Sequence, residues 1–382
     1  METEKLYYQD PLLTEFSAKV LSCTQTAKGY QVILDATAFY PEGGGQPCDF
    51  GRLGDAKVLD VREQEGELLH TCDKPLEAGS RVTGKICWER RLDLMQQHTG
   101  EHILSGIICK RYGAHNVGFH MGSDVTTIDF DKPIPQEDIP VLEAIANGAI
   151  FQNQPVRCEY PSEEELENIP YRSKRRLPYP VRIVTAGEYD CCACCGTHLP
   201  FTGQVGQIKI LSMVKFHQGV RMEIVCGGRA LSWFQKTWEQ NKLVCQEFSA
   251  KPLETGAAAK RMNEALAAEK FRGVAIQRQL FDYIAADYAQ KGDSLCFRDG
   301  LEPAQVRLLA EKIAATCGGT AMVFSLPNFC LANLQGGDVS KLGKALTGTL
   351  SGRGGGRDGF FQGSLNATQE AVETVICTMH KE

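Results

Sequence analysis

Two pairs of metal-binding residue types, each with the same spacing of four positions, constrain this chain more than any other feature of its sequence. His98 and His102 form the first pair, and Cys194 and His198 form the second. On a helix, residues four apart lie on one face, about one turn from each other, so both can reach one ion. Three imidazoles and one thiolate suit Zn²⁺. Because the chain has only eight histidines, the two pairs predict a single zinc site.

Two other interpretations use the same residues. The cysteine-rich segment 191–195 contains two overlapping Cys-x-x-Cys pairs, a pattern that also occurs in redox sites and in four-cysteine zinc sites. The run from His98 to His102 has the His-x-x-Glu-His pattern of a class of metalloproteases, in which Glu101 is the general base. A zinc-dependent metallopeptidase is therefore an alternative function.

A first glycine-rich run follows a predicted strand that ends at Asp35. It contains Gly43, Gly44 and Gly45, followed by Gln46. Consecutive glycines let backbone N–H groups approach a ligand closely. The run lacks the lysine and hydroxyl residue of a P-loop, so binding of a nucleoside triphosphate is not expected. The alternative is a sharp bend in a barrel.

A second glycine-rich run lies near the C-terminus, in a stretch with a local charge of one sign. Between residues 339 and 357 the chain carries four basic residues and no acidic one, and the basic residues include Arg353 and Arg357. With Phe360 and Phe361 close in sequence, this run favours a surface that contacts phosphates and bases. The alternative is a solvated turn.

The alternation of apolar and polar residues predicts an α+β protein of several domains. Short strands over residues 1–84 indicate a small β-barrel, and 85–228 reads as an α+β zinc-binding domain. Residues 229–292 read as a helical hairpin, either a spacer or a face packed on its own domain, and 293–382 as an α/β domain. The apolar spacing predicts helices over 91–111, 140–151, 257–290, 303–317, 339–350 and 367–379.

The overall charge excludes a general nucleic-acid binder. The chain has 41 basic and 47 acidic residues, for a net charge of −6. A specific RNA can still bind, because only the surface near its phosphates must be positive. No apolar run reaches the roughly 18 residues that a membrane helix requires, and the N-terminus is polar. We therefore expect a cytoplasmic protein with reduced thiols and no membrane segment.

Several of these motifs together resemble a known family. The two ligand pairs, with the segment from Thr37 to Pro47, are similar to the editing domain of alanyl-tRNA synthetase and to its free-standing relatives, the AlaX-type alanyl-tRNA editing proteins. The run from Gly354 to Gln362 resembles the DHH-associated C-terminal domain of that synthetase. The resemblance covers about residues 10–382 and leaves no room for the adenylating domain, so we do not expect the chain to charge tRNA.

The resemblance implies a trans-editing hydrolase. Its substrate would be tRNA-Ala mischarged with serine or glycine, and the ester at the 3′ adenosine would be hydrolysed in a site containing Zn²⁺. It also implies that the C-terminal domain binds tRNA through Arg353 and Arg357 and forms a homodimer. A non-catalytic tRNA-binding protein is a further alternative. The implied site residues are Thr37 (contact with the serine hydroxyl), Gln46 and Glu101 (catalytic), Gly43, Gly44 and Gly45 (substrate), and His98, His102, Cys194 and His198 (metal).

Overall fold

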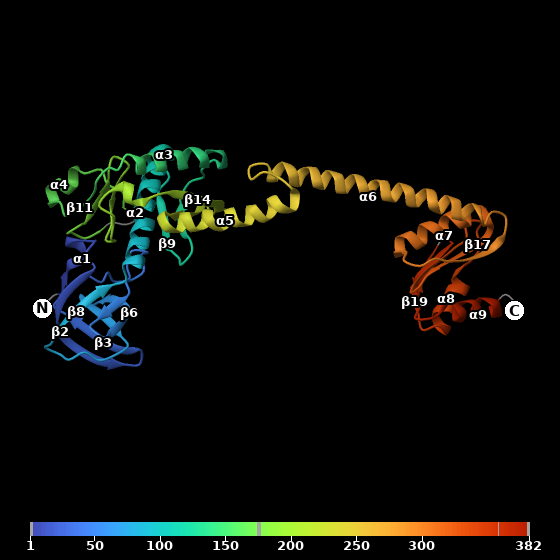
Figure 1. The fold of residues 1–382 in the computed structure, drawn as a ribbon, viewed down its shortest axis with the longest axis horizontal. Helices are drawn as coiled ribbons and strands as arrows, with labels where there is room; N and C mark the ends of the chain where they lie inside the picture. Colours follow the sequence, from blue (N-terminus) through green and yellow to red (C-terminus); the bar gives the residue numbers. More distant parts are fainter. Residues whose placement is uncertain (1–2, 174–176, 358, 380–382) are drawn as a thin grey trace. The chain divides into compact units, whose positions relative to one another are not determined.

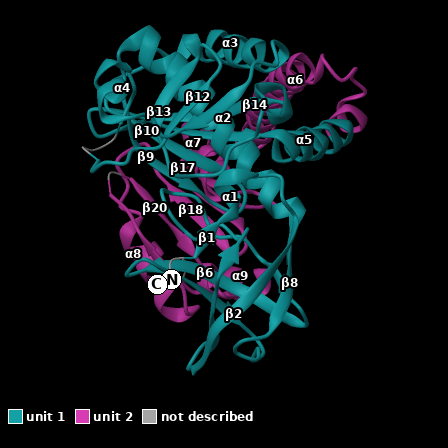
Figure 2. Ribbon diagram, turned by 90° about the vertical axis from the view of Figure 1, so that its left-hand side faces the viewer, with its two compact units in different colours: residues 1–243 teal, residues 244–382 magenta. Residues whose placement is uncertain are grey.

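The computed structural model of this protein describes residues 3–173, 177–357 and 359–379, and it divides into two compact units. Unit 1 spans residues 1–243 and unit 2 spans 244–382 (Figures 1 and 2). Helices and strands are mixed throughout both units, which confirms the α+β class. The finer division into four domains remains a prediction. Among the described residues, every helix is too short or too polar to cross a lipid bilayer.

The first part of unit 1 is a closed barrel in which the strand order is β2-β3-β7-β6-β5-β8. Burial alternates along its strands, as expected when one face of each strand lines a core. That core includes Val20, Val32, Leu34 and Val58. The strands are β2 (Glu15–Thr26), β3 (Gly29–Leu34), β5 (Gly51–Leu53), β6 (Ala56–Gln64), β7 (Glu67–Cys72) and β8 (Arg81–Ile86).

A short N-terminal segment lies beside the barrel. Strand β1 (Glu4–Lys5) pairs in parallel with β4 (Ala36–Thr37), and helix α1 (Leu6–Gln9) follows β1 directly. The chain then passes from β4 through the first glycine-rich run to β5. The run is therefore a connection outside the barrel ladder, not a bend within a barrel strand.

The long helix α2 (Trp88–Tyr112) is the centre of the rest of unit 1. Its residues are buried on nearly all sides from Leu94 to Ile108, and the helix ends at Gly113, whose left-handed backbone favours glycine. Helix α3 (Ile139–Phe151) packs against it. Because other elements of unit 1 surround α2, the polar side chains in the middle of this helix are buried together with the apolar ones.

Two antiparallel sheets and several short helices complete this part. One sheet has the order β14-β15-β10-β9, and the other has the order β11-β12-β13. Helix α4 begins at Glu163, and Ser162 and Glu165 form a reciprocal capping box at its start. The remaining bounds are β9 (Asn116–Met121), β10 (Thr126–Phe130), β11 (Val156–Glu159), α4 (Glu163–Asn168), β12 (Ile183–Ala186), β13 (Asp190–Ala193), β14 (Ile208–Phe216) and β15 (Gly219–Cys226), with short 3₁₀ helices at Gln136–Asp138 and Thr202–Val205.

Two long helices follow the sheets. Helix α5 (Gly227–Phe248) crosses the boundary between the units, and α6 (Thr255–Ala286) belongs to unit 2. The break between them falls around Pro252, within the segment 229–292 that the sequence predicts to be a helical hairpin. Leu231, Trp238 and other apolar residues of α5 remain exposed.

Unit 2 has three layers. Its sheet has the order β16-β17-β18-β20-β19, and β16 and β17 run parallel because helix α7 crosses between them. One face of the sheet packs with α7 and the end of α6, and the other packs with α8 and α9. The bounds are β16 (Gly292–Phe297), α7 (Pro303–Cys317), β17 (Gly318–Ser325), β18 (Asn328–Ala332), α8 (Ser340–Thr349), β19 (Arg353–Gly355), β20 (Phe360–Ser364) and α9 (Gln369–Met379).

The second glycine-rich run is partly a strand, not the solvated turn that was the alternative interpretation. Arg353–Gly355 forms the edge strand β19, paired with β20. Phe361 is 3% exposed and stacks on Phe329, so it cannot contact a base as expected from the sequence. Gly343 is needed for this packing, because a Cβ there would meet the Phe361 ring at 2.3 Å.

Candidate metal centre

The described part of unit 1 brings the two predicted ligand pairs together. His98 and His102 project from α2, and Cys194 and His198 follow strand β13. One donor atom from each residue lies within 4.8 Å of all the others. The Nε2 atoms of His98 and His198 are each 3.4 Å from the Cys194 Sγ. The three histidines are buried and the cysteine is half-buried.

The hydrogen bonds behind the cluster show that it fits a cation. The Nδ1 of His98 lies 2.8 Å from the Gln46 Oε1, and the Nδ1 of His102 lies 2.8 Å from the Asp190 Oδ2. Because both oxygens accept, the neutral rings carry their proton on Nδ1 and turn an Nε2 lone pair toward the centre. Tetrahedral Zn–N and Zn–S bonds give a nitrogen–sulfur distance of roughly 3.5 Å, close to the distances found.

Gln46 and Asp190 are themselves held in place. The Gln46 Nε2 donates to the Thr197 Oγ1 at 2.7 Å, which fixes the orientation of the amide. Asp190 accepts a bidentate pair of hydrogen bonds from Arg172, at 2.6 and 2.8 Å. Sequence reasoning found Gln46 but missed Asp190 and Arg172, since neither has a fixed spacing from the histidines.

Charges in the cluster favour the deprotonated forms of Cys194 and Asp190. Burial raises the pKa of the Cys194 thiol, but His98 and His198 lower it well below its ordinary value. Burial also raises the pKa of Asp190, but hydrogen bonds from His102 and Arg172 keep it below its ordinary value. Cys194 is therefore favoured as a thiolate and Asp190 as a carboxylate, both next to the imidazoles.

A pocket of about 210 Å³ opens at the cluster. Glu101 lines it and is buried, and its Oε1 accepts hydrogen bonds from the Ser105 hydroxyl at 2.6 Å and from the Asn116 amide. The Glu101 Oε2 lies 3.9 Å from the His102 Nε2. The lining residues are Gly44, His98, Glu101, His102, Asn116, Phe119, Arg172, Ser173, Leu177, Cys192, Ala193, Cys194 and Cys195.

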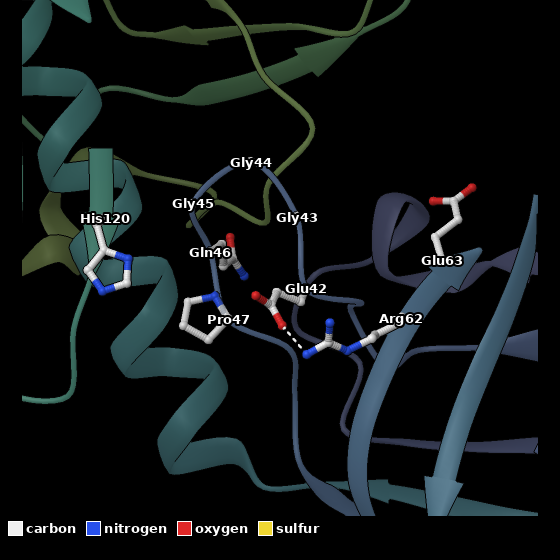
Figure 3. A pocket seen from close by; sticks show the side chains of 9 residues that line it. All are labelled: Glu42, Gly43, Gly44, Gly45, Gln46, Pro47, Arg62, Glu63 and His120. Carbon is white, nitrogen blue, oxygen red and sulfur yellow. Dashed lines mark ion pairs between the residues drawn. The ribbon is translucent and has the colours of Figure 1, made fainter. Parts of the chain in front are cut away.

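The first glycine-rich run forms the rim of this pocket. Gly43 and Gln46 exchange two backbone hydrogen bonds, of 3.0 and 2.9 Å, and close a turn around Gly44 and Gly45. Both central residues have positive φ, of 60° and 89°, which glycine adopts at low cost. Figure 3 shows the tip of this turn between His120 on one side and the Glu42–Arg62 ion pair on the other. A second pocket, of about 340 Å³, opens beside this turn. Gly44 lines both this pocket and the pocket at the metal cluster.

Thr37 lies elsewhere, in strand β4, where it contacts His70 of barrel strand β7. Its hydroxyl is 2.9 Å from the His70 Nε2 and accepts a hydrogen bond from the Phe39 N–H at 3.1 Å. The His70 Nδ1 contacts the Val32 carbonyl, which can only accept, so the Thr37 hydroxyl must donate to Nε2. Thr37 is fully buried and is not among the described residues that line either pocket.

The remaining candidate residues are two arginines of unit 2 and two further cysteines of the segment 191–195. Arg353 and Arg357 are exposed residues of unit 2. Cys192 forms a second group with His102 and Asp190 in which one donor atom from each lies within 4.8 Å of the others. Cys195 is exposed, and all cysteines of the described residues are free thiols.

Two segments of the chain match models of tRNA synthetase domains. Residues 3–90 match the model of the class II (A) tRNA synthetases, and residues 181–223 match the threonyl and alanyl tRNA synthetase second additional domain. The second match covers β13 and the Cys194–His198 pair. Both matches lie in unit 1.

The chain is homologous to alanine–tRNA ligases and to alanyl-tRNA editing proteins. It is 32% identical to the alanine–tRNA ligase of Pyrococcus abyssi over 98% of this chain and 43% of the ligase. It is 37% identical to that of Pyrococcus furiosus over 68% of this chain and 30% of the ligase. It is 28% identical to the alanyl-tRNA editing protein Aarsd1-B of Xenopus laevis over 96% of this chain and 95% of that protein. The chain thus spans less than half of these ligases and nearly all of the editing protein.

Proposed function

We propose that this chain is a trans-editing deacylase, which hydrolyses the ester between a misattached serine or glycine and the 3′ adenosine of tRNA-Ala. The observation that carries the proposal is the buried four-donor cluster, which opens on a pocket at the tip of a glycine turn. The end-to-end similarity to a protein named as an alanyl-tRNA editing protein supports the same activity.

We infer that the ion is Zn²⁺, held by His98, His102, Cys194 and His198. The set of three nitrogens and one sulfur, and the nitrogen–sulfur distances of 3.4 Å, support this choice. Zinc bound there supplies a positive charge beside the substrate ester. Because these four residues would hold the ion, we assign the proton transfers to other groups of the pocket.

In this proposal Glu101 moves the proton. The oxygen of a water molecule forms a bond to the ester carbonyl carbon, and its proton passes to the Glu101 carboxylate. The bond from carbon to the ribose oxygen then breaks, and the same proton passes to that oxygen, which leaves a free amino acid and a ribose hydroxyl. The glycine turn at Gly43, Gly44 and Gly45 holds the substrate at the pocket rim, and Gln46 acts by positioning His98.

For unit 2 we propose a role in binding the body of the tRNA. Arg353 and Arg357 are exposed on and next to edge strand β19, and Lys341 and Lys344 lie on the preceding helix, α8. Phosphate contacts by such residues do not depend on base sequence. The resemblance to the synthetase adds that this unit forms a homodimer.

The decisive experiment is deacylation of purified, labelled aminoacyl-tRNA by the full chain. We expect hydrolysis of Ser-tRNA-Ala and Gly-tRNA-Ala, with Ala-tRNA-Ala spared. Glu101→Gln should bind the ion normally and lose most of the activity. Cleavage of casein with no deacylation would support the metallopeptidase instead, and tRNA binding without turnover would support a non-catalytic binding protein.

A further inference from the structure

A row of tyrosine rings leads from the glycine turn to the surface of unit 1. Tyr40 contacts Tyr7 edge to face, with ring centroids 5.4 Å apart, and Tyr7 contacts Tyr8 at 4.6 Å. Tyr8 in turn contacts Tyr160 at 6.4 Å. These residues come from three distant parts of the sequence: α1, the segment before the glycine turn, and the segment between β11 and α4.

Two hydrogen bonds attach this row to the candidate site. The Tyr40 hydroxyl donates to the Gly43 carbonyl at 3.2 Å. The Tyr8 hydroxyl donates to the Cys195 carbonyl at 2.9 Å, and Cys195 lines the pocket of the metal cluster. Tyr8 therefore lies at the edge of that pocket without lining it.

The buried side chain of Arg182 contacts the row at Tyr8. The Arg182 guanidinium lies 4.7 Å from the centroid of the Tyr8 ring and donates to the carbonyls of Cys194 and Gly196, both at 2.9 Å. Arg182 is 6% exposed. A cation over an aromatic face fixes the ring and adds a positive charge next to the pocket.

The outer end of the row is the part most open to solvent, and Tyr8 next to it is half-buried. Tyr160 is 54% exposed, whereas Tyr7 and Tyr40 are buried. A large aromatic ring that is held by its neighbours and still exposed beside a binding pocket is the usual platform for stacking an unpaired base, because every base has a π-face.

We propose that Tyr160, backed by Tyr8 and Arg182, is the stacking platform for the base of the nucleotide that carries the ester. This rests on the proposed function. At about 210 Å³ the pocket is smaller than the roughly 300–1,000 Å³ of common ligand sites, so the aminoacyl ribose fills it and the base lies outside. Helix α4, which follows Tyr160, begins with Glu163, Glu164 and Glu165. These acids disfavour a continuing phosphate chain and favour a terminal base.

Direct binding to the full chain tests the platform without any need for turnover. The probes are the trinucleotide CCA and the same trinucleotide whose 3′-terminal ribose lacks its base. We expect the wild-type chain to bind CCA about 5- to 150-fold more tightly, which is the usual effect of one stacked base. Tyr160→Ala should abolish that preference, and Tyr160→Phe and Tyr160→Trp should keep it.

Matched controls separate stacking from structural damage. Phe151→Ala removes another ring of unit 1, 85% exposed at the end of α3, and should keep the preference. The proposal is overturned if wild type shows no preference, if Tyr160→Ala retains it, if Tyr160→Phe loses it, or if Tyr160→Ala weakens both probes equally. A preserved preference in a chain that deacylates nothing would reject the proposed function and retain the platform.

Discussion

At the scale of single residues, the groups behind the histidines constrain the cluster as much as the donor atoms do. Gln46 and Asp190 each accept a hydrogen bond from the Nδ1 of one ring and so turn its Nε2 toward the centre. Such supporting contacts commonly change metal affinity by about 10- to 100-fold. The cluster is therefore preorganised before any ion arrives.

Cys194 and Cys195 are adjacent thiols that should behave differently. The Cys194 Sγ contacts two imidazoles, whereas Cys195 is exposed and is not in the described group of donors. Cys194→Ala should lose the ion, and Cys195→Ala should keep about one zinc per chain, the content of a single four-ligand site. Elemental analysis of both purified variants measures this. Metal loss only in Cys195→Ala would show that the ligand assignment is wrong.

Thr37 and His70 form a buried pair that we assign to barrel stability. Burial lowers the pKa of His70 to about 4, whereas the unfolded value is about 6.5. The unfolded chain therefore takes up a proton below about pH 6.5 and the folded chain does not until about pH 4. Stability from this residue is complete above pH 6.5 and decreases as the pH falls toward 4.

This difference predicts a measurable dependence of stability on pH. Between pH 7 and pH 5, His70 should remove about 2 kcal/mol from the free energy of unfolding. His70→Gln should be less stable at pH 7 and should lack that part of the acid loss. Urea unfolding of both proteins at the two pH values gives the comparison. Equal losses in wild type and variant would contradict the assignment.

At the scale of elements, the glycine turn shows how a loop and a strand fix the site together. The Gly45 carbonyl accepts a hydrogen bond from the Met121 N–H of β9 at 3.3 Å. On the same strand, the Phe119 ring stacks on His98, with centroids 5.1 Å apart. The position of the turn is therefore coupled to a ring of the metal cluster.

Substituting alanine at two neighbouring glycines separates backbone strain from this contact. A Cβ on Gly45 would lie 2.8 Å from Phe119, whereas a Cβ on Gly44 meets nothing within 4 Å. Both residues have positive φ, so each alanine should cost about 1–2 kcal/mol of stability. Gly45→Ala should cost about 1–3 kcal/mol more and lower the metal content. Chemical unfolding and elemental analysis test the pair, and equal effects would reject the coupling.

At the scale of the whole molecule, the metal cluster and the basic stretch 339–357 belong to different units. The metal cluster belongs to unit 1, and Arg353 and Arg357 belong to unit 2. The 3′ end of one tRNA is much like that of another, so contacts with the rest of the tRNA must add affinity. Phosphate contacts add it in a salt-dependent way.

We expect the double variant Arg353→Ala/Arg357→Ala to bind tRNA more weakly and with a smaller dependence on salt. The slope of log K against log salt should fall in magnitude by up to about 2, because two fewer counterions are released. The metal content should not change. Lys28→Ala/Arg81→Ala, which removes two exposed charges of the barrel, is the control. An unchanged slope in the first variant would leave dimerisation as the role of unit 2.

Features that depend on neighbours along the chain were predictable from the sequence. Helix α7 begins at Pro303 and ends at Cys317 as predicted, because its apolar period, its starting proline and the glycine after it act within a few residues. The two ligand pairs were visible for the same reason, since a spacing of four on one turn is local. The resemblance to a family then extended these local signals to a function.

Contacts between groups far apart in the sequence became known from the folded structure. Asp190 reaches His102 because strand β13 packs against α2, and Thr37 reaches His70 because β4 lies beside barrel strand β7 at that point. The run at Arg353 became an edge strand because β20 offered it a partner. In each case the partner lies outside the local window and depends on strand pairing and packing, which short-range periodicity does not specify.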